Sequence, residues 1–228
     1  GLDEVWVGEH HSTGWEYIAS PEIFLAVAAE RTRHIRLGTG AVSLTYHHPL
    51  MVADRIVLLD HLTRGRVMLG VGPGQLTSDA HMLGIPADTQ RPRMEECLDA
   101  IMALLRGETV SMETDGFVLQ DARLQLAPYS QPHLEVAVAA SYSPTGARAA
   151  GRHGIGMLSI AATAKQGIGM LAHHHARVLL LERLGPRLCP AQRRPDSRRA
   201  ACEIGGLAEL AGLSSRAGLG QQGGRLLL

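Results

Sequence analysis

Residues 44–74, LTYHHPLMVADRIVLLDHLTRGRVMLGVGPG, constrain the fold of this chain more than any other segment. A loop runs into a helix that opens at Pro49, where a proline at the first helical position is favoured. The apolar positions of this helix at helical spacing are Val52, Ile56 and Leu59. Gly65 follows the helix in the C-terminal capping role, and the apolar strand 67–72 comes next. A continuous apolar strand reached through a helix is typical of a parallel sheet that is covered on both faces.

Four more apolar runs, at residues 5–7, 34–42, 134–139 and 155–160, predict strands of the same kind. Helices are predicted between most of them, and the polar and glycine residues gather at the strand ends. This pattern predicts an α/β fold of the (β/α)₈ TIM-barrel type, in which the chemistry lies at the C-terminal ends of the strands. Only about five strand–helix units are recognisable, so the barrel is predicted to be incomplete.

Local signals define the remaining elements of the first 164 residues. Ser20 is predicted to be an N-cap and Pro21 the first residue of a helix, whose Phe24, Val27 and Ala28 share one face. A loop is predicted up to Pro92, followed by the helix 94–107. Residues 109–128 alternate between apolar and polar residues around Asp115-Gly116, which predicts a hairpin-like insertion.

Composition excludes several classes of function. The net charge of zero divides into −6 for residues 1–164 and +6 for residues 165–228. The basic part has no aromatic residue to stack on a base, so we expect no nucleic-acid partner. No apolar run is long enough to span a membrane, and the start at Gly1 shows no signal-peptide pattern, so the expected location is cytoplasmic. Three widely spaced cysteines predict reduced thiols.

Residues 165–228 form a separate, irregular segment rich in Arg, Gly, Ala and Leu. Two interpretations stay open, a natural disordered basic tail and a stretch translated in another reading frame of a GC-rich gene. The second is favoured, because these residue types are what GC-rich codons give in any frame. The run His173-His174-His175 is not a metal site, because consecutive helical residues fan out around the axis.

Three groups of residues are candidates for chemistry from their positions alone. His10 and His11 follow the first strand beside Glu9, where a catalytic and a purely structural role stay equally open. An adjacent histidine pair cannot easily hold one metal ion, so no metal site is predicted. The glycine-rich residues 70–74 allow a flat ring to approach the backbone or simply a tight strand exit. Residues 141–146, between a strand and a helix, suit a phosphate or ordinary helix capping.

Taken together, VWVGEHH, IRLGTGAVSL, YHHPLMVADRIVLLDHLTRGRVMLGVGPG and VAVAASYSPTGARAAGRHG resemble the bacterial luciferase-like flavin monooxygenases. The resemblance covers residues 1–164 in the order of the family. It implies an enzyme that oxidises a small organic substrate with molecular oxygen and with reduced FMN supplied by a separate flavin reductase. It also implies that the first strand and the last two strands of the barrel are missing here. Pairing of subunits through helix 49–62 is a further expectation.

The resemblance also assigns roles to single residues. His10 matches the histidine that takes part in the oxygen chemistry of the flavin. Gly40 and Ala41 match the segment that passes against the flavin ring, and Gly72 belongs to the glycine-rich strand exit beside it. Ser143 matches a serine that binds the flavin phosphate, with the backbone N–H of Tyr142 next to it.

One departure from the family concerns the phosphate. Pro73 stands where luciferase has a phosphate-binding arginine, so the missing charge has to come from elsewhere, with Arg148 and Arg152 as candidates. Two alternatives stay open: a deazaflavin-dependent oxidoreductase on the same barrel, and an inactive truncated or frame-shifted relic. The substrate cannot be derived from these residues.

Overall fold

The computed structural model describes residues 2–14, 16–140, 144–159 and 225–227. No helix among them is long and apolar enough to cross a membrane. The strands are β1 Glu4–Val7, β2 Arg36–Thr39, β3 Val42–Ser43, β4 Val67–Gly72, β5 Val110–Glu113, β6 Val118–Ala122, β7 Val136–Ala140, β8 Gly156–Ser159 and β9 Arg225–Leu227. The helices are α1 Pro21–Arg31, the 3₁₀ turn η1 Leu44–Tyr46, α2 Pro49–Thr63, α3 Thr77–Met82, α4 Gln90–Leu105 and α5 Pro144–His153.

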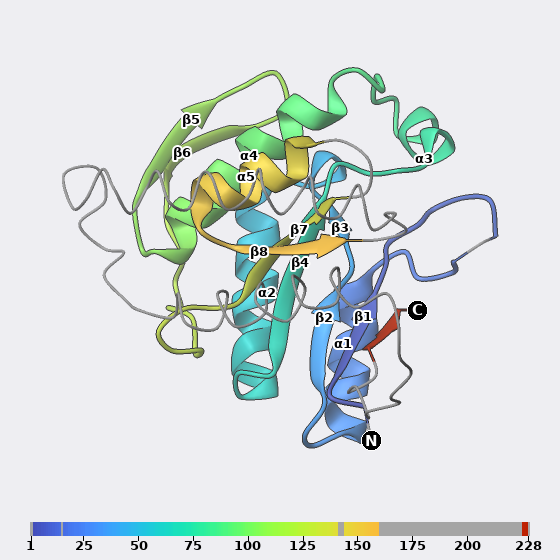
Figure 1. Cartoon of the computed structure of the whole chain (residues 1–228). Coiled ribbons are helices and arrows are strands. Elements are labelled where there is room, and N and C mark those ends of the chain that lie inside the picture. The colour runs from blue at the N-terminus through green and yellow to red at the C-terminus, as the bar shows by residue number, and fades with distance from the viewer. Residues whose placement is uncertain (1, 15, 141–143, 160–224, 228) are drawn as a thin grey trace, which may run out of the picture.

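The main sheet is parallel and follows the order of the chain. Its strands lie in the order β8-β7-β4-β2-β1-β9, and β3 pairs with the far end of β4. Along the series β1, β2, β4, β7 and β8, each strand lies beside the one before it and is reached through a connection that contains a helix (Figure 1). This is the winding of one side of a (β/α)₈ barrel, and it brings the C-terminal ends of the strands to one edge.

The two faces of the sheet carry side chains of different size. Val5, Val7 and Leu37, with the valines and leucines of β4 and β7, pack on α1, α2 and α4 in the main core. The opposite face has Trp6, Met68 and Ala137, with Leu158 packed against them. Gly38 lies opposite Trp6 in the β1–β2 register, and a Cβ there would overlap the indole ring. Glycine therefore makes room for the indole ring of Trp6 on the inner face.

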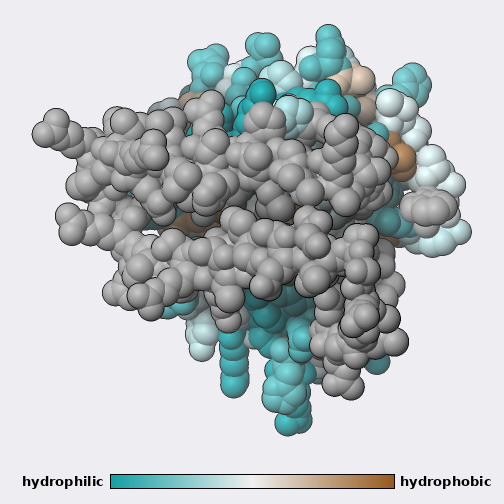
Figure 2. All heavy atoms as spheres, in the orientation of Figure 1, coloured by the Kyte–Doolittle hydropathy of each residue, from teal (hydrophilic) through white to brown (hydrophobic). Residues whose placement is uncertain are grey.

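The helices of the described residues pack on one face of the sheet. α1 and α2 pack against each other, and α2 packs against α4 (Figure 1). In the same orientation, most of the described side chains that reach the surface are hydrophilic (Figure 2). Cys97 lies inside this helical layer, where burial raises the pKa of its thiol to about 12, so it stays protonated and unreactive.

The predicted strand 34–42 is divided into β2 and β3 in the structure. At the break, the side chain of Thr39 bonds to the backbone of β4. The Thr39 hydroxyl donates to the Gly70 carbonyl at 2.7 Å, and the Gly70 N–H donates to the same hydroxyl at 2.9 Å. Beyond this point the chain turns through a cis peptide bond between Gly40 and Ala41, and β3 pairs with β4 at Val42. The break moves residues 40 and 41 to the edge of the sheet where the strands end.

Two other predictions need correction. The loop expected up to Pro92 contains α3, and α4 begins at Gln90 rather than at residue 94. Ser20 stands at the N-cap of α1, but its side chain makes no capping bond, and its carbonyl receives the N–H groups of Ile23 and Phe24. In α3, buried side chains fix a short helix that lacks a strong sequence signal.

The apolar face predicted for α1 is largely on the surface. Phe24 and Val27 are exposed, whereas Leu25 and Ala29 point into the core. Helical periodicity shows which residues share a face, but it does not show which of two apolar faces the protein buries.

β5 and β6 form an antiparallel pair within the range 109–128 predicted to be a hairpin, with a register shift between Val110 and Met112. Of the segment 165–228, the structure describes only β9, which runs parallel to β1 at the edge of the sheet. The boundary at residue 164 and the origin of the tail stay predictions.

Gly70→Ala is expected to destabilise the protein, because a Cβ at this position would lie 2.0 Å from the Thr39 carbonyl oxygen. Overpacking of this kind costs about 1–3 kcal/mol of unfolding free energy. Gly72→Ala, on the same strand, is the matched control, since its Cβ would meet only ordinary contacts at 3.6 Å. Chemical denaturation measures both variants, and equal midpoints would contradict the role given to Thr39.

Candidate functional site

The polar residues of the site collect where β1, β3 and β4 end. The chain leaves β1 through Gly8, Glu9, His10 and His11, while the chain after β4 turns into α3 (Figure 1). Parallel winding brings these segments together although they lie far apart in the sequence.

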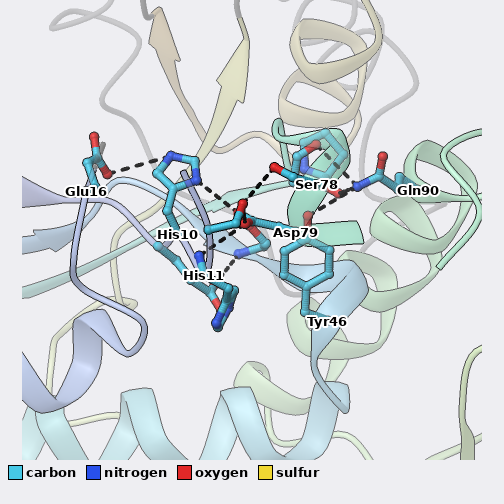
Figure 3. A network of polar contacts seen from close by, with 12 residues as sticks. His10, His11, Glu16, Tyr46, Ser78, Asp79 and Gln90 are labelled. Carbon is cyan, nitrogen blue, oxygen red and sulfur yellow. Dashed lines mark hydrogen bonds and ion pairs between the residues drawn. The ribbon is translucent and has the colours of Figure 1, made fainter. Parts of the chain in front are cut away.

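His10 lies between two carboxylates. Its Nδ1 atom is 3.2 Å from Oδ2 of Asp79 in α3, and its Nε2 atom is 3.7 Å from Oε2 of Glu16 (Figure 3). The side chain of His10 is 18% exposed and that of Asp79 only 1%. The imidazole is therefore anchored on its buried side and reachable on the other.

Asp79 is held by several donors at once. It accepts hydrogen bonds from the His11 N–H at 3.2 Å and from the Ser12 hydroxyl at 2.5 Å, in addition to His10. The Ser12 hydroxyl also contacts that of Ser78 at 2.6 Å (Figure 3). Burial by itself raises the pKa of Asp79, but the hydrogen bonds from Ser12, His10 and the His11 N–H lower it below its ordinary value overall. Asp79 is thus an ionised carboxylate at neutral pH.

Glu9 is the centre of a second cluster of hydrogen bonds, one residue before His10 in the chain. Its Oε1 atom is 2.7 Å from Nε2 of His47 and 3.0 Å from Nε2 of His11, and its Oε2 atom accepts the Ser43 N–H at 2.7 Å. Burial raises the pKa of this carboxyl, but the bond and charge of His47, the Ser43 N–H and His11 lower it overall. An ionised carboxylate only accepts, so His11 and His47 both donate from Nε2.

The two adjacent histidines therefore have different environments. His10 is paired with Asp79, whereas His11 is paired with Glu9 and meets the Tyr46 ring edge-on at 5.9 Å between centroids. The sequence left open whether either histidine is functional. The structure gives each histidine its own buried carboxylate partner, and the functional role of His10 stays a prediction.

Tyr46 joins the two clusters to the chain after β4. Burial raises the pKa of its phenol, and the charges of Asp79 and Glu9 raise it further, so the hydroxyl stays protonated. Gln90 Nε2 donates to this hydroxyl at 3.4 Å and to the Pro73 carbonyl at 3.2 Å. A Cβ on Gly74 would collide with the phenol, and its φ of +85° also requires glycine.

A cavity of about 360 Å³ adjoins these clusters. Tyr46 and His47 line it together with Arg93 from α4 and Gly116 from the β5–β6 turn. The hairpin insertion thus forms one wall of a polar space next to the Glu9 cluster.

Small residues line the strand ends on the inner face. A Cβ added to Gly72 would meet only the Cβ atoms of Ala41 and Ala139, both at 3.6 Å. Gly40 lies against the backbone and Cβ of Trp6, the inner side chain next to it. The three residues predicted to face a flavin ring, Gly40, Ala41 and Gly72, thus come together at the strand ends, and we call this group the cradle; its contact with a flavin ring stays a prediction.

The described part of the structure does not place the residues predicted to bind the phosphate next to this group of small residues. Tyr142 and Ser143 lie outside the described residues. Arg152 bonds Glu95 at 3.1 Å and Asp99 at 2.8 Å on α4, so the geometry does not support it as a source of phosphate charge. Arg148 is exposed on α5.

Sequence reasoning missed Glu9, His47 and Asp79 as members of the site. Glu9 and His47 belong to the EHH and YHHP motifs, which are a signal in retrospect. Asp79 lies in the segment predicted to be a loop, where no pattern marks it. Within the described part of the chain, no group of three His, Cys, Asp or Glu side chains is placed to hold a metal ion.

Comparison with known proteins agrees with the motifs. The sequence profile of the luciferase-like monooxygenases matches residues 1–179. The chain belongs to this family. It is 57% identical over 174 residues to limonene 1,2-monooxygenase of Rhodococcus erythropolis, a match that covers 76% of this chain and 44% of that protein. The chain thus spans less than half the length of this relative.

Two solved structures share the fold. Monooxygenase RslO1 from Streptomyces bottropensis superposes with a TM-score of 0.71 at 27% identity, covering 91% of this chain and 65% of that one. The oxygenating constituent of 3,6-diketocamphane monooxygenase of Pseudomonas putida, solved in complex with FMN, gives a TM-score of 0.69 at 23% identity, covering 86% and 55%. The prediction of an incomplete TIM-barrel-type fold is confirmed.

The family match extends to proteins with another cofactor. An F420-dependent glucose-6-phosphate dehydrogenase of Amycolatopsis mediterranei is 31% identical over 171 residues, which is 69% of this chain and 49% of that protein. Family membership alone therefore does not decide between a flavin and a deazaflavin.

Glu9→Gln is expected to lower stability at neutral pH by about 1–3 kcal/mol, because the donors around the buried carboxylate lose a charged acceptor. Because the pKa of Glu9 is lower in the folded protein than its ordinary value of 4.5, ionised Glu9 stabilises the folded state at any pH above 4.5. This stabilisation is lost as the pH falls through the pKa of Glu9 in the folded protein. The wild type should thus lose stability below about pH 4.5, and Glu9→Gln should lose less there. Thermal unfolding across pH tests this, with Glu113→Gln on β5 as the control. Identical acid profiles would refute it.

Proposed function

We propose that this protein is a flavin-dependent monooxygenase that uses reduced FMN and molecular oxygen to oxidise a small organic substrate. The observation that carries the proposal is the pairing of His10 with buried Asp79 at the strand ends, the same end of the sheet as the cradle of Gly40, Ala41 and Gly72. A proton-transfer group next to a site for a flat ring is what such chemistry needs. Two relatives support it, one named as a limonene monooxygenase and one an oxygenating constituent that binds FMN.

The division of labour follows from the residues. Reduced FMN, when bound, supplies the redox chemistry with oxygen. The small residues at the strand ends back its ring, and Ser143 with the Tyr142 N–H is proposed to hold its phosphate before α5. His10 exchanges a proton through Nε2, the ring nitrogen on the side away from Asp79.

The proposal includes a second protein and a location. The FMN-binding structural relative is one constituent of its enzyme, which supports a separate flavin reductase as the donor of reduced FMN. A cytoplasmic location is part of the same proposal, because the reductase draws on nicotinamide cofactors. Deazaflavin use is the competing proposal, and it is supported by the F420-dependent relative.

His10→Ala is expected to keep its affinity for reduced FMN and to lose product formation by about 10²–10⁴-fold, the usual contribution of general acid–base catalysis. Binding is measured anaerobically by flavin fluorescence with FMN and with F420 in parallel. Turnover is measured with a flavin reductase, oxygen and limonene as the first substrate probe.

His34→Ala is the control, since this histidine is exposed in the chain that precedes β2 and makes no described contact with the site. Full turnover by His10→Ala would withdraw the role of His10. Binding of F420 without binding of FMN would transfer the proposal to hydride chemistry.

We also propose that the protein forms a dimer through α1 and α2. The two helices lie side by side and are joined by an ion pair from Arg55 to Glu22 at 2.7 Å. Their outer surface carries exposed apolar side chains, which are Ile23, Phe24, Val27, Met51, Leu58 and Leu62. Several large exposed apolar side chains on two helices that pack together favour an interface on this side of the protein.

Val27→Lys combined with Leu58→Lys is expected to convert the dimer to a monomer with little change in secondary structure. Sedimentation equilibrium measures the mass. Leu126→Lys is the matched control, because Leu126 is a similarly exposed leucine in the chain that follows β6. A wild-type mass equal to that of one chain would refute the proposed interface.

A further inference from the structure

We propose that Asp79 is the positioning residue of His10: it keeps Nδ1 protonated and thereby makes Nε2 the nitrogen that exchanges protons with a bound ligand. This inference rests on the proposed function for the role of His10. It concerns a residue that neither the motifs nor the sequence pattern marked, 69 positions away in the chain.

The contact is asymmetric in a way that suits orientation. Asp79 is almost fully buried and His10 is partly exposed, so the fixed partner is the carboxylate and the ring is the group that is held. Asp79 Oδ2 faces Nδ1, while its Oδ1 atom is engaged by the His11 N–H and the Ser12 hydroxyl. These bonds leave the Asp79 carboxylate little freedom to rotate. The hydrogen bond from Nδ1 to this carboxylate therefore fixes the orientation of the His10 ring.

The charge state of Asp79 decides the tautomer of His10. The hydrogen bonds that it receives, acting against its burial, hold the pKa of Asp79 below its ordinary value. An ionised carboxylate can only accept a hydrogen bond, so Nδ1 has to carry the proton. In the neutral ring the lone pair is then on Nε2. A buried carboxylate fixes the tautomer and direction of an imidazole in the same way in other catalytic sites.

The far side of the ring completes the arrangement. Nε2 of His10 is 3.7 Å from Oε2 of Glu16, too far for a good hydrogen bond. That oxygen is buried and has no hydrogen-bond partner among the described residues. The charged groups that face the ring are Asp79 and Glu16, and Tyr46 lies close enough for the charges of Asp79 and Glu9 to raise the pKa of its phenol. Among the described residues, Nε2 is thus the ring nitrogen of His10 without a hydrogen bond of its own.

The direct test is the tautomer of His10 in the full chain, read from the ¹⁵N shifts of the labelled imidazole without any cofactor. The expected result in the unmodified protein at neutral pH is the Nδ1–H form. Asp79→Asn keeps the shape but removes the charge, so the Nε2–H form should increase. Ser78→Ala is the matched control, because it removes a hydroxyl from the same network without touching the ring.

The functional readout is the pH profile of limonene oxidation with reduced FMN. In Asp79→Asn we expect product formation to fall at least about tenfold and the shape of its pH profile to change, because the carboxylate that faces Nδ1 is gone. Asp79→Glu retains a carboxylate and should restore part of the rate. A merely structural role would change stability and leave the shape of the pH profile unaltered.

The outcomes separate this inference from the function on which it rests. An Nε2–H tautomer in the unmodified protein overturns the role of Asp79, whether or not Asp79→Asn folds. An unchanged tautomer and pH profile in folded Asp79→Asn also overturns it. A tautomer that changes as expected, together with full turnover by His10→Ala, supports the positioning and removes the proposed catalytic role of His10.

Discussion

The buried carboxylate of Glu9 is the interaction on which the functional end of this sheet depends. A carboxylate that is 2% exposed is very costly unless it is fully hydrogen-bonded. Glu9 obtains its donors from three places, namely the next residues of its own chain, β3 at Ser43 and the turn before α2 at His47. Satisfying one charge thus fixes the relative positions of three segments. Around that fixed point His10 turns away toward Asp79.

The second constraint is the difference in size between the two faces of the strands. Branched side chains face the helices, and the inner face carries Trp6, Met68 and Leu158 beside glycine and alanine. The large inner side chains pack around Trp6, and the small residues lie at the strand ends. The Thr39–Gly70 bonds then end the β2–β4 ladder early, and residues 40 and 41 pass to the sheet edge. The cradle therefore follows from packing within the sheet.

Much of the fold could be predicted, because its signals are local. The apolar run 67–72, the proline that opens α2 and the Asp115-Gly116 turn each determine structure within a few residues. The errors occurred where local signals are weak or ambiguous. α3 has only six residues and is fixed by buried Asp79 and Ala80, and α1 has two apolar faces of which the protein buries one.

By itself, the sequence determined the order of strands and helices, the presence of glycine at the strand ends, the family and the position of His10. These properties depend on short spacings and on residue type. Only the tertiary structure decided which histidine meets which carboxylate, because Asp79 is 69 positions from His10 and Glu9 is 38 from His47. The bonds form because parallel winding brings the strand ends together and buried charges require partners, and no pattern along the chain records that distance in space.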